Sequence, residues 1–199
     1  MRNLTLITIS MLLMIPVTLR AQESVDEPLK ILKENTEKIR ELVLNSKTEE
    51  EMQENVKELM DEFVNFEEFG KLSLGKQWKT LTEEQQKSYL VQFRALLQRT
   101  YLRRFKPGKE FEVKYRSETR LNKKGDRGEI QTTIISGDVE ADVDYRFHKT
   151  DGWKVYDMVV DEVSIMRNYR KSFLKILKRD GFEALIEKMK KKTSDAPEE

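Results

Sequence analysis

Four aspartates that lie close together in the sequence are the side chains best suited to chemistry. Asp142, Asp144, Asp157 and Asp161 could act as paired acid and base, or could hold a cation. Asp142 and Asp144 are two residues apart, so on a strand both lie on the face opposite Val143. In a sheet covered on one side that face meets solvent. We therefore expect exposed or ion-paired carboxylates rather than a catalytic pair.

Other reactive residue types are scarce. His148 is the only histidine and the chain has no cysteine, so there is no metal site built on His and Cys and no thiol chemistry. The sequence also lacks a glycine-rich phosphate loop, a nucleophile elbow and zinc-ligand spacing. We expect His148 at the surface, and we predict no catalytic residue, no metal and no enzymatic activity.

A basic cluster near the end of a long predicted helix could bind an anion. It comprises Arg103, Arg104 and Lys106. If a cavity opens beside this helix end, a guanidinium at its rim could contact a phosphate. The alternative is an ordinary solvated surface.

A second basic cluster comprises Arg167, Arg170 and Lys171, and Arg170 could instead form a salt bridge with Asp157 or Asp144. Over the whole chain 37 Lys and Arg balance 36 Asp and Glu, which gives a net charge of +1. That balance argues against nucleic acid as a partner. Any function of the basic residues must therefore be local.

Helices are predicted on both sides of a central segment, because apolar residues there recur at three- and four-residue steps. The clearest begins with a capping box, in which Thr82 and Gln85 satisfy each other's backbone amides, and ends at Pro107-Gly108. The predicted helices span residues 25–44, 48–64, 66–73, 82–105 and, with a break at Gly181, 163–189.

The central segment changes to a period of two, which predicts half-buried antiparallel strands. Turn signals at Gly125-Asp126, Gly137-Asp138 and Asp151-Gly152 separate them. In the last strand we expect Val155 and Val159 on one face and Met158 on the other. The strands are predicted around residues 111–115, 130–134, 139–147 and 153–160.

Together these elements predict an α+β fold. Helices from both chain ends would pack on one face of a four-stranded, curved antiparallel sheet and enclose an apolar cavity. A closed core is the alternative. The candidate lining residues come from facing elements and are Phe93, Leu97, Tyr101, Tyr115, Val143, Tyr145, Val159, Met166 and Phe173.

The N-terminal segment predicts export. Residues 1–21 have the form of a secretory signal peptide, with Arg2 before an apolar stretch and cleavage expected after Ala21. A retained anchor is the alternative, but the stretch is shorter than the ~20 residues that span a bilayer. The remainder predicts one domain over residues 22–192 and a disordered tail over residues 193–199.

A series of short motifs resembles a known family. Their order and spacing, from about residue 27 to about residue 190, are similar to those of the MlaC, or toluene-tolerance, family. Two positions depart from the family pattern, because Asn65 stands in place of an Asp and Glu162 in place of a Gly. The motifs are Leu74-Gly75-Lys76-Gln77-Trp78, Thr82-Glu83-Glu84-Gln85, Thr100-Tyr101, Asp144-Tyr145-Arg146, Gly152-Trp153-Lys154-Val155-Tyr156-Asp157, Val163-Ser164 and Asn168-Tyr169-Arg170.

The resemblance implies a periplasmic carrier of phospholipid. Such a protein needs no cofactor, holds the lipid as cargo by its acyl tails, and maintains the lipid asymmetry of the outer membrane. Its partners would be an outer-membrane lipoprotein complex and an inner-membrane ABC transporter complex with a membrane-anchored substrate-binding subunit, each met transiently by a monomer. The candidate lining residues would contact the tails, and Arg103, Arg104 and Arg170 the headgroup.

Two other functions remain open from the sequence. One is a small-molecule enzyme on a cone-shaped α+β fold, with Asp157 as the group that transfers a proton. The other is a periplasmic adaptor with a solid core, which binds partners through its outer face and carries no lipid.

Overall fold

The computed structural model describes residues 18–194, so most of the predicted signal peptide and the last part of the predicted tail, residues 195–199, lie outside the described residues. Thr193 and Ser194, which the sequence assigns to the tail, form the end of the last helix. The helices are α1 (Thr18–Asn45), α2 (Glu49–Phe63), α3 (Phe66–Leu74), the 3-10 helix η1 (Gly75–Thr80), α4 (Glu83–Leu102) and α5 (Ile165–Ser194).

Side-chain caps explain where several helices begin. The Thr82 hydroxyl accepts from the Gln85 amide while the Gln85 side chain accepts from the Thr82 amide, which confirms the predicted capping box of α4. Asn65 caps α3 by accepting a 2.9 Å hydrogen bond from the Glu68 amide, so Asn replaces the family's Asp without loss of the cap. The predicted break at Gly181 is also present, with φ 87° and ψ −178° inside α5.

The sheet is an antiparallel meander whose spatial order follows the sequence. The α+β class and the curved antiparallel sheet are therefore confirmed, and a two-residue strand at one edge brings the number of strands to five in place of the predicted four. The strands are β1 (Glu112–Leu121), β2 (Arg127–Ser136), β3 (Val139–Lys149), β4 (Trp153–Val160) and β5 (Val163–Ser164).

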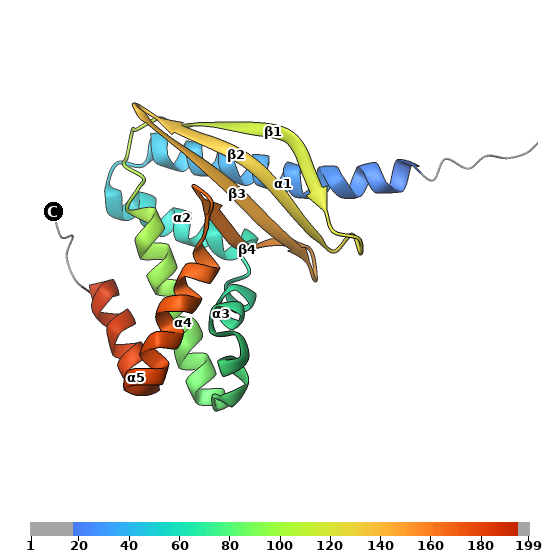
Figure 1. The fold of residues 1–199 in the computed structure, drawn as a ribbon. Helices are drawn as coiled ribbons and strands as arrows, with labels where there is room; N and C mark the ends of the chain where they lie inside the picture. The colour runs from blue at the N-terminus through green and yellow to red at the C-terminus, as the bar shows by residue number, and fades with distance from the viewer. Residues whose placement is uncertain (1–17, 195–199) are drawn as a thin grey trace, which may run out of the picture.

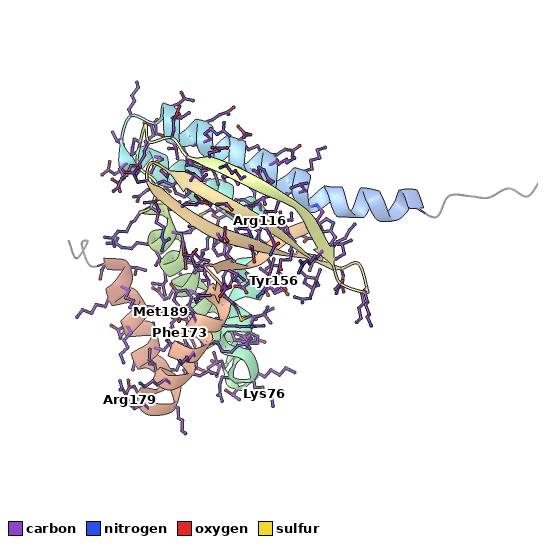
Figure 2. The ribbon with its side chains drawn as sticks, turned by 45° about the horizontal axis from the view of Figure 1, so that its top comes forward. Lys76, Arg116, Tyr156, Phe173, Arg179 and Met189 are labelled. Atoms are coloured by element: carbon purple, nitrogen blue, oxygen red, sulfur yellow. The ribbon has the colours of Figure 1, made fainter. Side chains whose placement is uncertain are left out.

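All the helices lie on the same side of the sheet (Figure 1). Helix α1 runs beneath the strands and contacts β1, β2 and β4, and the Trp153 indole donates a 2.9 Å hydrogen bond to Glu27 of this helix. The remaining helices form a bundle in which α4 packs against α5 and α3, and Phe173 and Met189 of α5 are buried within it (Figure 2). Helices from both chain ends thus cover one face, as predicted.

One extra residue in β4 changes which of its side chains face the helices. Arg146 pairs with Asp157 and Phe147 pairs with Val155, so Tyr156 has no partner in β3. Such a bulge reverses the alternation of side chains along the strand beyond it. Val155 and Met158 consequently share a face, whereas a regular strand would place them on opposite faces.

Candidate functional site

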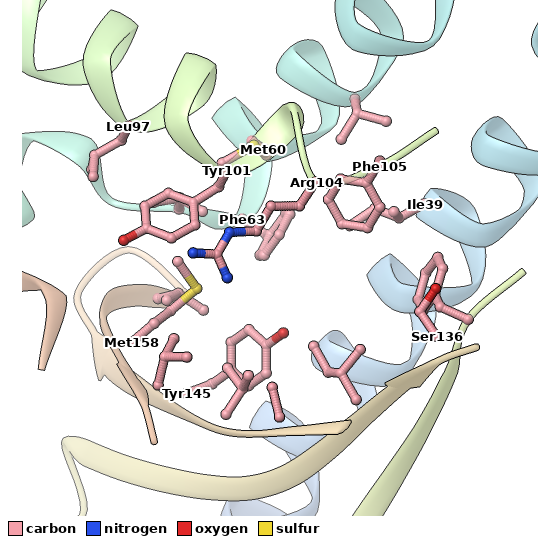
Figure 3. Close-up of a pocket in the computed structure, with 18 of the residues that line it drawn as sticks. Ile39, Met60, Phe63, Leu97, Tyr101, Arg104, Phe105, Ser136, Tyr145 and Met158 are labelled. Atoms are coloured by element: carbon pink, nitrogen blue, oxygen red, sulfur yellow. The ribbon is translucent and has the colours of Figure 1, made fainter. Parts of the chain in front are cut away.

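An apolar cavity of about 500 Å³ lies between the inner face of the sheet and the helices (Figure 3). Its volume falls within the range of roughly 300–1,000 Å³ that is usual for sites that enclose one small molecule. The sheet contributes Ile134, Ala141 and Val160 among others, and the helices contribute side chains from α1, α2, α3 and α4. The curvature of the sheet leaves this space unfilled.

Five of the residues that the sequence nominates lie on the cavity wall. Leu97 and Tyr101 come from α4, Val143 and Tyr145 come from β3, and Arg104 follows the end of α4. Figure 3 shows Tyr101 and Tyr145 on opposite sides of the cavity. The turn of α4 and the alternation of β3 therefore aim these side chains at one another across the space.

Phe93 and Phe173 lie outside the cavity lining and belong to an aromatic cluster within the helical bundle. Their ring centroids are 6.2 Å apart, and Phe93 stacks on Tyr89 at 5.6 Å. Both are essentially buried. They hold α4 against α5. The prediction that they line the cavity is therefore wrong, and both belong to the closed core of the bundle.

Tyr115 and Met166 also lie away from the lining. Tyr115 faces α1, where the Lys33 ammonium is 5.3 Å from its ring centroid. Met166 is buried in the first turn of α5, and its amide donates a 3.0 Å hydrogen bond to Asp157. Each packs two elements together, so neither contributes to the wall of the cavity.

The bulge at Tyr156 explains why the predicted position of Val159 on the cavity wall is wrong. Counting alternate residues from Val155 puts Val159 on the cavity face, but the extra residue turns it to the opposite side. Val155, Met158 and Val160 line the cavity instead. No sequence signal marked this bulge, because only the pairing with β3 defines it.

Other lining residues were missed although the sequence carried a signal for them. Val56, Met60 and Phe63 of α2 form an apolar stripe that the periodicity identified as the buried side of a surface helix. Phe105 and Phe111 belong to the loop between α4 and β1, and their ring centroids lie 5.6 Å apart in an edge-to-face arrangement. That they face a cavity follows from the position of α2 and this loop over the sheet.

The three nominated arginines have different surroundings. Arg104 lines the cavity, and Figure 3 shows its guanidinium pointing into the space near Met158. Arg103 is exposed at the end of α4 and lies outside the lining. Arg170 donates a 2.8 Å hydrogen bond from Nε to the Leu72 carbonyl and so caps the end of α3. Arg170 therefore joins α5 to α3 and lies outside the cavity lining, and it bonds to neither of its two suggested carboxylate partners.

The aspartates considered as a catalytic pair lie away from the cavity. Asp142 is exposed and pairs with Arg116 on the outer face of the sheet, as expected. Asp157 differs, because its side chain is fully buried and accepts from Arg146 Nη1 at 3.1 Å. Neither residue lines the cavity. Within residues 18–194, no group of His, Asp and Glu side chains is arranged to hold a metal ion.

His148 is less exposed than the sequence indicates. Its Nδ1 lies 2.8 Å from a carboxylate oxygen of Glu68, which joins β3 to α3. Arg127 donates to the other oxygen of the same carboxylate at 3.0 Å. These contacts link the sheet to the bundle on the side away from the cavity lining.

The apolar character of the cavity shows in the tyrosines on its wall. Burial raises the pKa of Tyr145 well above its usual value of 10.0, and the nearby Tyr115 hydroxyl adds to the increase. Burial likewise raises the pKa of Tyr101, against an opposing effect of Arg104. Both phenols are neutral at physiological pH, so neither adds charge to the cavity wall.

The fold and the site together define an α+β protein with an apolar cavity, at whose mouth lie three exposed cations of the lining, Arg104, Lys106 and Lys109. A model of the MlaC protein family matches residues 22–191, and the chain therefore belongs to the MlaC family. Among residues 18–194, no helix combines the length and the apolar character needed to cross a membrane.

A curated relative agrees with this assignment, and a solved structure shares the fold. The chain is 30% identical over 139 residues to the intermembrane phospholipid transport system binding protein MlaC of Haemophilus influenzae, and the match spans 66% of this chain and 64% of that protein. A phospholipid-binding protein from Ralstonia solanacearum, solved in complex with a phospholipid, has the same fold, with a TM-score of 0.64, 23% identity, and coverage of 87% of this chain and 94% of that one.

Proposed function

We propose that this protein binds a phospholipid by placing its acyl tails in the cavity. The observation that carries the proposal is the apolar cavity between the sheet and the helices, in a chain of the MlaC family. Each methylene group moved from water into such a space contributes about 0.8 kcal/mol. A diacyl lipid has dozens of these groups, so an enclosing protein is needed to carry it through water.

The proposed role is that of a carrier in the periplasm. After cleavage of residues 1–21, the domain over residues 22–192 would take lipid from one membrane complex and deliver it to another, and so maintain the lipid asymmetry of the outer membrane. The partners would be an outer-membrane lipoprotein complex and an inner-membrane ABC transporter complex with its anchored substrate-binding subunit. Hand-over requires the partner to offer the tails a second apolar path, because release into water is unfavourable.

Binding is favoured over catalysis by the position of the candidate acid. Asp157 is fully buried on the far side of β4, and its carboxylate is occupied by Ser164, Met166 and Arg146. A general acid must reach the proton that it transfers. The cavity itself favours a carrier over an adaptor. An adaptor binds through its outer face and has no need of a cavity, whereas a carrier requires one.

Native mass spectrometry of the protein purified from its exporting cell, followed by lipid extraction, tests the proposal. We expect phospholipid at about one molecule per chain. The substitution Ala141→Trp fills the cavity from the wall of β3 and should reduce the bound fraction by about tenfold, while the circular-dichroism melt stays cooperative.

The matched control is Val91→Trp, which adds the same side chain on the exposed side of α4. It should retain lipid at the level of the unmodified protein. A stably folded protein that carries no lipid, both as purified and after incubation with phospholipid vesicles, would overturn the proposal and favour the adaptor.

A further inference from the structure

The loop between α4 and β1 supplies most of the charge at the mouth of the cavity. Arg104, Lys106 and Lys109 all belong to it and all contribute to the lining. Its backbone is held in place because the Gly108 amide donates a 2.8 Å hydrogen bond to the Val43 carbonyl at the end of α1. The three cations are therefore presented together by one anchored segment.

These cations are incompletely neutralised. Glu49 pairs with Lys106 at 3.0 Å. In the described part of the chain no carboxylate lies within ion-pairing distance of Arg104 or Lys109. No Asp or Glu of the described residues belongs to the cavity lining, so the charges of Arg104 and Lys109 lie next to an apolar wall without a paired carboxylate.

Arg104 has the position of an anion anchor. Its guanidinium lies 5.5 Å from the centroid of the Tyr101 ring, and it points into the cavity between Tyr101 and Met158 (Figure 3). The contact with the ring favours this position of the guanidinium, and its N–H donors face the cavity (Figure 3). A phosphate diester can accept two of these donors at once, which a neutral glycerol hydroxyl cannot do.

We propose that Arg104 binds the headgroup phosphate of the cargo and that the positive mouth makes the protein prefer anionic headgroups over zwitterionic ones with the same tails. This inference rests on the proposed function, since it concerns the lipid whose tails occupy the cavity. A phosphatidylglycerol headgroup carries a net negative charge. A phosphatidylethanolamine headgroup adds an ammonium group that Lys109 and Arg104 repel, which lowers its share of the bound lipid.

A competition experiment with matched tails tests the preference. The delipidated protein is incubated with vesicles that contain equal amounts of dipalmitoyl phosphatidylglycerol, dipalmitoyl phosphatidylethanolamine and dipalmitoylglycerol, and the bound lipids are quantified after repurification. At low salt we expect phosphatidylglycerol to exceed phosphatidylethanolamine by about threefold and dipalmitoylglycerol by up to about tenfold. Added salt should reduce both ratios, because the mouth is open to solvent.

The variant Arg104→Gln should lower the ratio of phosphatidylglycerol to dipalmitoylglycerol toward one. Arg104→Lys should give an intermediate ratio, since it keeps the charge and loses the paired donors. The matched control is Arg103→Gln, which removes the same charge from a neighbouring residue outside the lining and should leave the ratios unchanged.

The outcomes separate the two proposals. Lipid bound in equal amounts regardless of headgroup, or the same ratios in Arg104→Gln as in the unmodified protein, would overturn the headgroup inference and leave the carrier function standing. Absence of all three lipids from the unmodified protein would overturn the carrier function itself. Equal loss of preference in Arg103→Gln and Arg104→Gln would also overturn the role of Arg104, because it would reflect net charge alone.

Discussion

The hydroxyl of Ser164 donates a 2.7 Å hydrogen bond to the carboxylate of Asp157, and this contact fastens the start of α5 to the sheet. The same carboxylate accepts a 3.0 Å hydrogen bond from the Met166 amide and a 3.1 Å bond from Arg146. A negative charge at a helix N-terminus is favourable, and here it also balances a guanidinium on β3. Asp157 thus acts as a junction between the sheet and the helical bundle.

Replacement of Asp157 should therefore affect stability. Asp157→Ala leaves Arg146 and the first amides of α5 without this acceptor, and we expect a loss of about 3 kcal/mol in the free energy of unfolding. Arg146 keeps Glu129 as a second partner, which limits the loss. Urea denaturation measures the change. Asp157→Asn retains an acceptor and should cost less than half as much. Equal stability of the unmodified protein and both variants would contradict the role of Asp157 in joining the sheet to the bundle.

The bulge at Tyr156 predicts opposite behaviour for two adjacent residues. The chain has no cysteine, so single thiols can be introduced at chosen sites. The thiol from Met158→Cys faces the cavity, and its reaction with a maleimide should slow at least about fivefold when lipid is bound, because the tails cover it. The thiol from Val159→Cys lies on the other face and should react at a rate independent of lipid. The reverse pattern would mean that β4 alternates without a bulge.

The turn between β4 and β5 should become more stable with glycine. Glu162 has φ 67°, a left-handed conformation that costs a side-chain-bearing residue roughly 1–2 kcal/mol. Glu162→Gly removes this strain but gives the unfolded chain more freedom, so we expect a net gain of about 0.5–1 kcal/mol in thermal or urea unfolding.

Asp161→Gly provides the comparison for this turn. Asp161 also has a positive φ of 46°, but its carboxylate accepts a 3.2 Å hydrogen bond from the Asp142 amide. Its replacement loses that bond together with the strain, so the gain should be smaller than for Glu162→Gly. A destabilised Glu162→Gly variant would show that the Glu162 side chain contributes more than its backbone strain costs.

Alkaline pH should unfold the protein through its buried tyrosines. Burial raises the pKa of Tyr89, Tyr101 and Tyr145 in the folded state above the ordinary value of 10.0. The free energy of unfolding is therefore unaffected by these tyrosines below pH 10 and decreases as the pH rises above it. The reason is that the unfolded chain releases these protons at a lower pH than the folded chain. A fully buried residue such as Tyr89 contributes at most about 1.4 kcal/mol per pH unit.

Urea denaturation at pH 9 and pH 11 measures the decrease, and the ultraviolet absorbance of phenolate follows ionisation directly. The phenolate absorbance of these three tyrosines should appear together with the loss of helical circular dichroism rather than before it. The variant Tyr145→Phe removes one of the groups and should reduce the loss of stability between the two pH values. A protein that ionises all its tyrosines while folded would contradict the assigned burial.

The local features of this protein were determined by its sequence alone. The capping box at Thr82, the break at Gly181, the change of period from helix to strand and the α+β class depend on residues near one another in the chain. Such features follow from hydrogen bonds and side-chain spacing within a few residues. The family motifs have the same local character, and their order sufficed to identify the family that the match over residues 22–191 shows.

The composition of the cavity wall was decided by the tertiary structure. The sequence cannot show that Tyr156 is the unpaired residue of β4, because that depends on its register with β3, and this one residue exchanges Val159 for Met158 on the wall. Likewise Arg104 and Arg170 each belong to a basic cluster in the sequence, which does not distinguish their roles. The partner of a long side chain depends on which groups the tertiary packing brings within its reach. For Arg170 that partner is the Leu72 carbonyl, whereas Arg104 remains at the mouth of the cavity with no carboxylate in ion-pairing distance among the described residues.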